Sequence, residues 1–542
     1  MVFARRSTTL LAAIVASCAM VLSLTACTSD NKTVVDGQTT VTSNSAGGVA
    51  VFTPSDGITL NQQTPLNKWA KLVPDLTKAL VDAGFKKGDI DHTTSDSLDK
   101  QSRAIQDFVV DHLSNNTTDD SGIAIAPDNM TLLVAPVVEA DASTRQYGDY
   151  VSQNLSTNDA TDEGATSDGD SSEDSSSKDD SSNTESDGTA SDEQAQAVDR
   201  LVSSLKLAKE SGMHVVLLGN SIEGYRPDAF VKFSDAQTIG KLQAEKMVSK
   251  LKLDKASKDN PKYIEVLLPY TAVDEKGNAN DSTFAQEAFR GIWQVLGSYY
   301  QKGVVESPSG TLDGKSTEND WQAVAYDAAK EGSTAKVLDK RLAKTDGQST
   351  LTRIDGIITM NDYIASEVVK ELDDLGYTGS AADINPQITI SGIVGNITGK
   401  KDLSRDAVPD PIKSPENDNA NDSSSSDDDA DKDTSSDKDR DSQWPLVTGY
   451  GAYVSNIPSI VNGKQWMTGM EDRQTIATDI AQACAKLNKD EALNSMPSIR
   501  NSEVGGVKKI PTISEPLLAV SASNLKSALI DPGYISLADA GL

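Results

Sequence analysis

The stretch "SGMHVVLLGNSIEGYRPDAFVKFSDAQTIGKLQAEKMV", residues 211–248, decides the fold class. It contains "MHVVLLGN", an unbroken apolar run without alternation, which is typical of a parallel strand buried on both faces. A second short strand, "AFVKFSD", and a helix, "QTIGKLQAEKMVSKLKL", follow along the chain. Such strand–helix repetition predicts an α/β fold with parallel sheets and right-handed crossovers.

The same alternation continues on both sides of this stretch. Before it lie the strand "VAVFTP", the helices "LNKWAKLVPDLTKALVDAGF" and "DKQSRAIQDFVVDHL", the candidate strands "GIAIAP" and "TLLVAPV", and the helix "AQAVDRLVSSLKLAKESG". After it come the strands "YIEVLLP", "IDGIITMND" and "PLVTG", the helices "FAQEAFRGIWQVLGSYY" and "YIASEVVKELDDLGY", and one long helix, "WQAVAYDAAKEGSTAKVLDKRLA". The number of these units predicts two sheets, and 542 residues are enough for two cores.

The charge of the chain is concentrated in two tracts. The formal net charge is -31, residues 156–193 contain 13 acidic residues and one basic residue, and residues 415–442 contain 11 acidic and three basic residues. Both tracts are rich in Ser and Asp and almost free of apolar residues, so they are predicted to be disordered inserts. The stretch "DDDADKDTSSDKD" does not match a calcium-binding loop. Counted from Asp427, the sixth position is Lys432 instead of Gly, and the twelfth is Lys438 instead of Glu. So acidic a chain lacks the basic footprint of a nucleic-acid-binding protein.

The N-terminus indicates export and lipid anchoring. A basic "MVFARR" precedes the apolar "TTLLAAIVASCAMVLS", which is too short for a stable membrane span. The following "LTAC" resembles a bacterial lipobox, which implies cleavage before Cys27 and acylation of its thiol; an ordinary signal peptide is the alternative. Acyl chains would hold the protein on the outer face of the cytoplasmic membrane. Cys18 leaves with the signal, so Cys484 is left without a disulfide partner and is predicted to be a small core residue.

Recognisable catalytic and cofactor motifs are missing from the sequence. The three histidines, His92, His112 and His214, do not form a metal-ligand spacing, and no HExxH, CxxC, GxSxG or phosphate-loop pattern occurs. We therefore expect a protein that is not an enzyme and that has no cofactor or metal.

Several segments, in this order, resemble the type I periplasmic sugar-binding proteins, in particular the xylose and multiple-monosaccharide lipoproteins of ABC transporters. They are residues 211–248, "IDGIITMNDYIASEVVKELDDLGY", "WPLVTGYGAYVSNIPSIVNGKQWMT" and the tail "KIPTISEPLLAVSASNLKSALIDPGYISLADAGL". The resemblance covers most of residues 49–542 apart from the acidic tracts. It implies two lobes, each a parallel sheet flanked by helices, joined by three crossovers and closing on a ligand in the cleft.

On this template the resemblance also implies domain boundaries. A signal peptide takes up residues 1–26 and a flexible tether residues 27–48. The N-terminal lobe is 49–235 plus 472–487, with the insert 156–193. The C-terminal lobe is 236–471 plus 510–542, with the insert 417–442.

The resemblance implies a ligand site at the strand ends. The candidate ligand-binding residues are Asp56, Asn220, Trp321, Asn361, Asp362, Tyr450, Tyr453 and Glu471. Asn361 and Asp362 match the family's Asn-Asp element, and Trp321 matches an aromatic residue that packs against the sugar face.

Three positions depart from the family pattern. Gly219 and Asn220 stand where Asp and Arg grip sugar hydroxyls, Gly451 stands in place of a carboxylate, and Glu471 stands in place of a basic residue. Charged groups give the stronger hydrogen bonds to hydroxyls, so these changes alter or abolish binding of an ordinary sugar.

Each candidate also has a structural interpretation. Asn361 and Asp362 could simply cap the helix that follows, since both residue types are favoured there. The other candidates could lie in the core rather than line the cleft: Trp321, Tyr450, Tyr453, Asn220 and Asp56.

We expect an extracytoplasmic solute-binding lipoprotein that captures a sugar or sugar-like molecule and presents it to the membrane subunits of an ABC importer. The alternative is an envelope sensor or interaction protein that keeps the fold and has lost ligand capture.

Overall fold

The computed structural model describes residues 34–35, 38–39, 46–55, 65–115, 125–138, 145–157, 188–273, 279–343, 350–381 and 443–542. The chain divides into two units, Met1–Asn44 and Ser45–Leu542. In the first unit, β1 (Val34–Val35) and β2 (Gln38–Thr39) pair antiparallel. The signal peptide, Cys27, Asp56, residues 158–187 of the first acidic tract and the whole of the second tract lie outside the described residues. Residues 188–193, which were predicted as part of the disordered insert, are helical instead, because α3 begins at Gly188.

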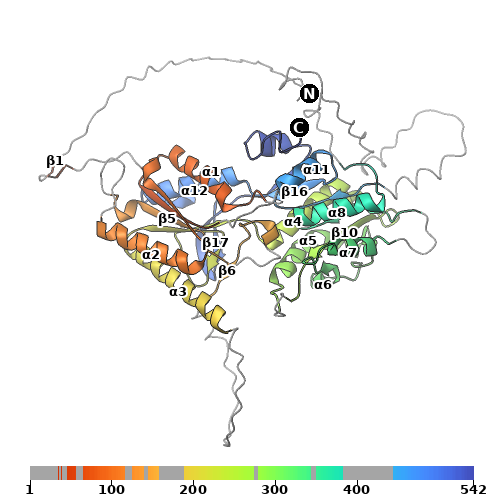
Figure 1. Cartoon of the computed structure of the whole chain (residues 1–542), viewed down its shortest axis with the longest axis horizontal. Coiled ribbons are helices and arrows are strands. Elements are labelled where there is room, and N and C mark those ends of the chain that lie inside the picture. The colour runs from red at the N-terminus through yellow and green to blue at the C-terminus, as the bar shows by residue number, and fades with distance from the viewer. Residues whose placement is uncertain are drawn as a thin grey trace, which may run out of the picture. The chain divides into compact units, whose positions relative to one another are not determined.

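The larger unit contains a seven-stranded sheet, in the order β17-β18-β9-β7-β5-β3-β4 (Figure 1). Its strands are β3 (Gly48–Pro54), β4 (Ile90–Ser95), β5 (Met130–Val134), β7 (His214–Leu218), β9 (Ala229–Lys232), β17 (Ile499–Val504) and β18 (Val507–Ser514). All neighbours are parallel except β17 and β18, which form an antiparallel pair.

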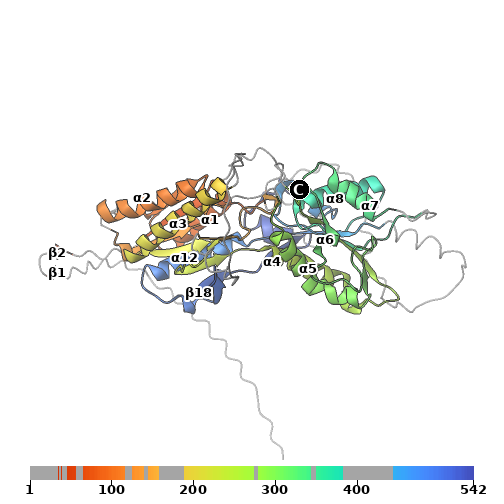
Figure 2. The same ribbon diagram turned by 90° about the horizontal axis from the view of Figure 1, so that it is seen from below.

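Both faces of this first sheet are covered by helices, as the unbroken apolar strands require. Val49 and Val51 of β3 belong to the apolar cluster of α1 (Trp69–Asp82) and α12 (Arg473–Leu487). Ala50 and Phe52 point the other way, into the cluster of α2 (Leu98–Asn115) and α3 (Gly188–Glu210), because successive strand residues face opposite sides. Figures 1 and 2 show α2 and α3 running side by side.

A second, four-stranded parallel sheet has the order β12-β10-β14-β15. Its strands are β10 (Lys262–Val266), β12 (Val305–Glu306), β14 (Gly356–Ile358) and β15 (Leu446–Val447). Helices α4 (Ala236–Leu251) and α5 (Thr283–Gln301) pack with Ile264 and Ile358 on one face. Helices α7 (Ser333–Arg341) and α8 (Asp362–Leu375) pack with Ile357 and Val447 on the other. Figure 2 shows α4 and α5 next to each other.

Short ladders and short helical segments also belong to the described part of the unit. The ladders pair β6 (Asn154–Leu155) with β8 (Ser221–Ile222), β11 (Leu268–Pro269) with β13 (Ala325–Tyr326), and β16 (Met467–Met470) with β19 (Leu518–Ser521). The helical segments include α6 (Trp321–Val324), α11 (Ile457–Val461), the π-helix Lys526–Ile530 and several three-residue 3-10 helices, among them Arg145–Tyr147.

The chain passes between the two sheets three times. It leaves the first sheet after β9 and enters the second through α4, returns after β16 through α12, and leaves again between β18 and β19. Asp235 and Asp472 cap α4 and α12 at the first two passages, where each carboxylate accepts a hydrogen bond from a backbone N–H. This architecture confirms the predicted fold class: α/β, with two sheets flanked by helices and joined by three crossovers. The first sheet is mostly parallel, since only β17 pairs antiparallel, and the second is parallel throughout.

Two predicted elements are wrong in detail. The single helix predicted over residues 321–343 is α6, the strand β13 and α7: α6 ends where Ala325 turns to the extended backbone of β13, and Gly332, with φ +69°, precedes the start of α7. Residues 510–514 belong to the first sheet through β18, which pairs with β9, whereas the sequence template assigned residues 510–542 to the second lobe. Cys484 is fully buried and carries no disulfide, as predicted.

Candidate functional site

The candidate site lies where loops following the strands of both sheets meet. We call the part of the unit built on the seven-stranded sheet the first lobe, and the part built on the four-stranded sheet the second lobe. In the second lobe, Asn361 and Asp362 follow β14, and Tyr450 and Tyr453 follow β15. The two loops are joined directly, since the Asp362 N–H donates to the Tyr450 carbonyl oxygen (3.0 Å). All four of these residues are buried, with at most 3% of any residue exposed.

The Asp362 carboxylate is the centre of a hydrogen-bond network within the second lobe. It accepts hydrogen bonds from the Tyr453 N–H (2.9 Å), Gln465 Nε2 (2.7 Å) and Thr468 Oγ1 (2.9 Å). Burial raises the pKa of Asp362 to about 6, although these three donors favour the charged form and lower it. The carboxylate of Asp362 therefore makes its hydrogen bonds to donors of the protein itself.

Asn361 has two separate roles. Its Oδ1 accepts from the Ile364 N–H (2.9 Å) and caps α8, which confirms the capping interpretation. Its Nδ2 donates to Gln146 Oε1 (3.1 Å), a residue of the first lobe. The capping bond fixes the side chain so that the amide nitrogen points across the space between the sheets.

A second buried carboxylate lies at the crossovers. Glu471, only 1% exposed, accepts from the Ser234 N–H (2.6 Å) and from the Tyr450 hydroxyl (3.5 Å). Tyr450 also shares a short hydrogen bond with the Ser234 hydroxyl. Burial raises the pKa of Glu471 to about 7, and the Ser234 bonds lower it. Because Ser234 precedes α4 and Glu471 precedes α12, this carboxylate ties the first two crossovers together.

The segment Gln146–Tyr150 of the first lobe, which sequence reasoning missed, faces the second-lobe residues. Gln146 accepts from Asn361 through its side chain and from the Tyr453 hydroxyl through its backbone oxygen (2.6 Å). The Tyr147 ring lies 4.7 Å from the Phe284 ring and 6.3 Å from the Tyr450 ring, centroid to centroid. One signal could have found the segment: "RQYGDY" is an aromatic, glycine-containing loop downstream of a buried parallel strand.

The remaining candidates lie elsewhere or are not described. Asn220 is 3% exposed and stays within the first lobe, where it accepts from the Gln153 N–H (2.9 Å) and donates to the Pro136 carbonyl oxygen (2.9 Å). Trp321 packs edge-on against Tyr270, with the ring centroids 5.1 Å apart, in the same apolar cluster as Tyr147 and Tyr450. The structure therefore joins Asn361, Asp362, Tyr450, Tyr453 and Glu471 in one network and places Trp321 in the apolar cluster of Tyr450, away from that network's hydrogen bonds.

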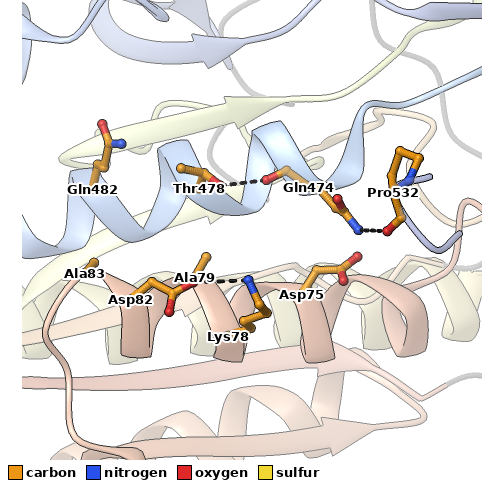
Figure 3. Close-up of a pocket in the computed structure, with 9 residues that line it drawn as sticks. All are labelled: Asp75, Lys78, Ala79, Asp82, Ala83, Gln474, Thr478, Gln482 and Pro532. Carbon is orange, nitrogen blue, oxygen red and sulfur yellow. Dashed lines mark hydrogen bonds and ion pairs between the residues drawn. The ribbon is translucent and has the colours of Figure 1, made fainter. Parts of the chain in front are cut away.

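An open groove lies between α1 and α12 (Figure 3). Its volume is about 600 Å³, and its lining residues are Asp75, Lys78, Ala79, Asp82, Ala83, Gln474, Thr478, Gln482 and Pro532. Lys78 pairs with Asp82 (3.2 Å), and Gln474 Nε2 donates to the Pro532 carbonyl oxygen (2.8 Å). None of the candidate residues lines this groove, and these four polar groups are paired with one another, so we do not assign the site to it.

The described residues contain no group of three or more His, Cys, Asp or Glu side chains placed to hold a metal ion. No helix of the described ranges is long and apolar enough to cross a membrane.

No protein-family model and no curated protein matches the chain. Solved structures do match the chain, at low sequence identity. An ABC transporter solute-binding protein from Clostridium phytofermentans with bound β-D-glucose has 17% identity and a TM-score of 0.44, over 91% of this chain and 99% of that one. A carbohydrate transporter solute-binding protein from Chloroflexus aurantiacus in complex with D-glucose has 18% identity and a TM-score of 0.42, over 92% and 98%.

A third similar structure is the periplasmic binding protein of the arabinose ABC transporter from Shewanella sp. ANA-3, bound to L-arabinofuranose. It has 10% identity and a TM-score of 0.39, over 88% of this chain and 93% of that one. These structural neighbours are sugar-binding proteins of ABC transporters.

Proposed function

We propose that the chain is an extracytoplasmic solute-binding lipoprotein, anchored through Cys27, that captures a sugar or sugar-like molecule between its two lobes for an ABC importer. One observation carries the proposal: hydrogen-bonding side chains of both lobes meet between the two sheets, where Asn361 Nδ2 donates to Gln146 Oε1 (3.1 Å). In open α/β sheets, ligands bind outside the carboxyl ends of the strands, and this contact lies at such ends.

The chemistry of the site suits a polyhydroxylated ligand. Asn361 offers a planar amide, Tyr453 offers a hydroxyl, and Trp321 and Phe284 contribute aromatic rings. Amides and hydroxyls can each donate and accept hydrogen bonds, as sugar hydroxyls do, and aromatic rings pack against the apolar face of a sugar ring. We include in the proposal that the protein has no catalytic activity.

Ligand-induced stabilisation tests this function. The chain from Thr28 onward keeps the whole unit Ser45–Leu542 and would be heated with pentoses, hexoses, sugar alcohols and short disaccharides. A ligand at about 100 times its Kd stabilises the folded state by about 2.7 kcal/mol, which raises Tm by several degrees. We expect at least one such ligand, and a smaller shift in Asn361→Ser, which keeps a capping oxygen and loses the Nδ2 donor. Gln322→Ala, an exposed change on α6, is the matched control.

A second function is favoured by the internal pairing of the carboxylates. Asp362 and Glu471 are 0% and 1% exposed and accept only from protein donors among the contacts given above. This arrangement suits an envelope sensor or interaction protein that has lost solute capture. No thermal shift with any member of the panel, in a protein that carries no small molecule after purification, would favour this function over import.

A further inference from the structure

The segment Gln146–Tyr150 reaches from the first lobe into the space between the two sheets. Its second half is fastened to its own lobe: Asp149 pairs with Lys68 (2.7 Å) and accepts from the Trp69 N–H (3.1 Å), while the Tyr150 hydroxyl donates to the Lys68 carbonyl oxygen. The Tyr150 ring stacks on Phe233 with the centroids 4.8 Å apart. These contacts hold the base of the segment in place.

The first half of the segment contacts the opposite lobe instead. Gln146 receives one hydrogen bond from Asn361 and one from Tyr453, and Tyr147 is 1% exposed within an apolar cluster that includes Trp321 and Tyr450. Gln146 thus meets Asn361, which was predicted to grip a sugar's hydroxyls, and Tyr147 lies in the apolar cluster that contains Trp321, which was predicted to pack against the sugar's face.

The turn between the two halves depends on Gly148. Its φ is +95°, in the region that favours glycine, and a Cβ atom there would lie 2.5 Å from the Asn67 carbonyl oxygen. Glycine therefore allows the segment to pass against Asn67 and direct Gln146 and Tyr147 across the interface.

Resting on the proposed function, we propose that Gln146 and Tyr147 act as an intramolecular plug: they occupy the solute's position between the lobes, and solute binding requires their displacement. The plug lowers apparent affinity, because only the fraction of molecules with the plug withdrawn can bind. It also holds the lobes together in the absence of solute, through the bonds to Asn361 and Tyr453.

The test measures the distance between two spin labels, one on each lobe, and the affinity of each variant for the solute. Spin labels at Asp107→Cys on α2 and Asp339→Cys on α7, both exposed positions, report the separation of the lobes. Cys484 is the one native cysteine after Thr28 and is fully buried, so it does not label. The variants are Gln146→Ala with Tyr147→Ala, Gln146→Ala alone, and Gln322→Ala as an exposed control. The single change keeps the Tyr147 packing and remains informative if the double variant does not fold.

We expect the double variant, without solute, to shift to longer distances between the labels, Gln146→Ala to shift partly, and the control to match the parent. We expect solute to bind the double variant about tenfold more tightly or better, since removing the plug increases the binding-competent fraction. Unchanged distances, or equal or weaker binding, would overturn the plug; weaker binding would make Gln146 and Tyr147 contacts of the solute.

The two proposals fail in different ways in this experiment. Longer distances in the double variant, with no solute bound by any form, would refute sugar capture and retain only the role of Gln146 and Tyr147 in holding the lobes together. Solute binding with equal affinity and equal distances in all forms would retain sugar capture and refute the plug.

Discussion

At the scale of single residues, the described part of the chain buries the carboxylates of Asp362 and Glu471 among uncharged hydrogen-bond donors, and both should contribute to its response to pH. Burial raises the pKa of Glu471 to about 7 and that of Asp362 to about 6. The folded state therefore binds protons more tightly than the unfolded state. Between pH 4 and pH 7 this difference makes the free energy of unfolding fall as the pH rises.

Glu471→Gln should remove part of this pH dependence. The Gln oxygen still accepts from the Ser234 N–H, and the change deletes a charge that is buried above pH 7. One pKa unit corresponds to about 1.4 kcal/mol, so the variant should be more stable than the parent at pH 8 by on the order of 1–3 kcal/mol. At pH 4 the two should be nearly equal. Urea unfolding at both pH values measures this, and an equal difference at pH 4 and pH 8 would contradict it.

Asp362→Asn should destabilise the second lobe. The carboxylate accepts three hydrogen bonds, and an amide NH₂ in one oxygen position would face a donor such as Gln465 Nε2. A buried donor left without an acceptor costs roughly 1–3 kcal/mol. Chemical unfolding at pH 7 measures the difference in the free energy of unfolding between the variant and the parent. The exposed change Asp339→Asn on α7 is the control, and its free energy of unfolding should lie within about 0.5 kcal/mol of the parent's.

At the scale of secondary structure elements, α4 and α5 approach each other through a pair of glycines. A Cβ atom on Gly291 would clash with the Gln237 carbonyl oxygen, and one on Gly240 would clash with the Ala288 carbonyl oxygen. Both helices cover the second sheet next to the first crossover, so their spacing bears on how the lobes are joined.

Gly291→Ala should therefore destabilise the protein by about 1–3 kcal/mol, as overpacking does. Helix propensity alone predicts the opposite sign, because Ala is favoured over Gly in a helix by about 1 kcal/mol. Ser298→Ala, on the exposed face of the same helix, should be neutral or slightly stabilising. Differential scanning calorimetry of the two variants decides the sign, and a more stable Gly291→Ala would refute the close approach.

The elements also show what the sequence can reveal. The apolar run around His214–Leu218 predicted a central strand because it had no polar face, and β7 lies between β5 and β9. β4 was missed because "IDHTTS" is polar, and its exposed side chains reflect its place at the edge of the sheet. Hydrophobic patterns in the sequence thus identify strands that are buried on both faces, but they do not identify a polar strand at the edge of a sheet.

The site was predicted in the same partial way. The Asn-Asp pair was predicted to follow a strand and does follow β14, where the structure links it to Tyr450, Tyr453 and Glu471. Their role as ligand contacts stays a prediction. Gln146 was missed because its partner Asn361 is 215 residues away, and single-residue patterns carry no information on such pairings.

At the scale of the whole larger unit, three crossovers join the two sheets, and two sets of side-chain contacts connect the lobes at and beside these crossovers. Glu471 and Ser234 connect the first two crossovers, while Gln146, Asn361 and Tyr453 join the lobes. Arg473, just after the second crossover, pairs with Asp75 of α1 (2.6 Å) and so fixes α12 against the first lobe. We infer that opening separates the Gln146 contacts and leaves the buried crossover network intact.

The measurement that tests the central claim most directly is a calorimetric titration of the protein from Thr28 onward with pentoses, hexoses, their alcohols and short disaccharides. The account predicts a solute with a micromolar or tighter Kd. It also predicts about three- to tenfold weaker binding in Asn361→Ser, which loses one hydrogen-bond donor worth roughly 0.5–1.5 kcal/mol. No heat of binding across the panel, in the parent and in the Gln146→Ala/Tyr147→Ala variant alike, would contradict solute capture.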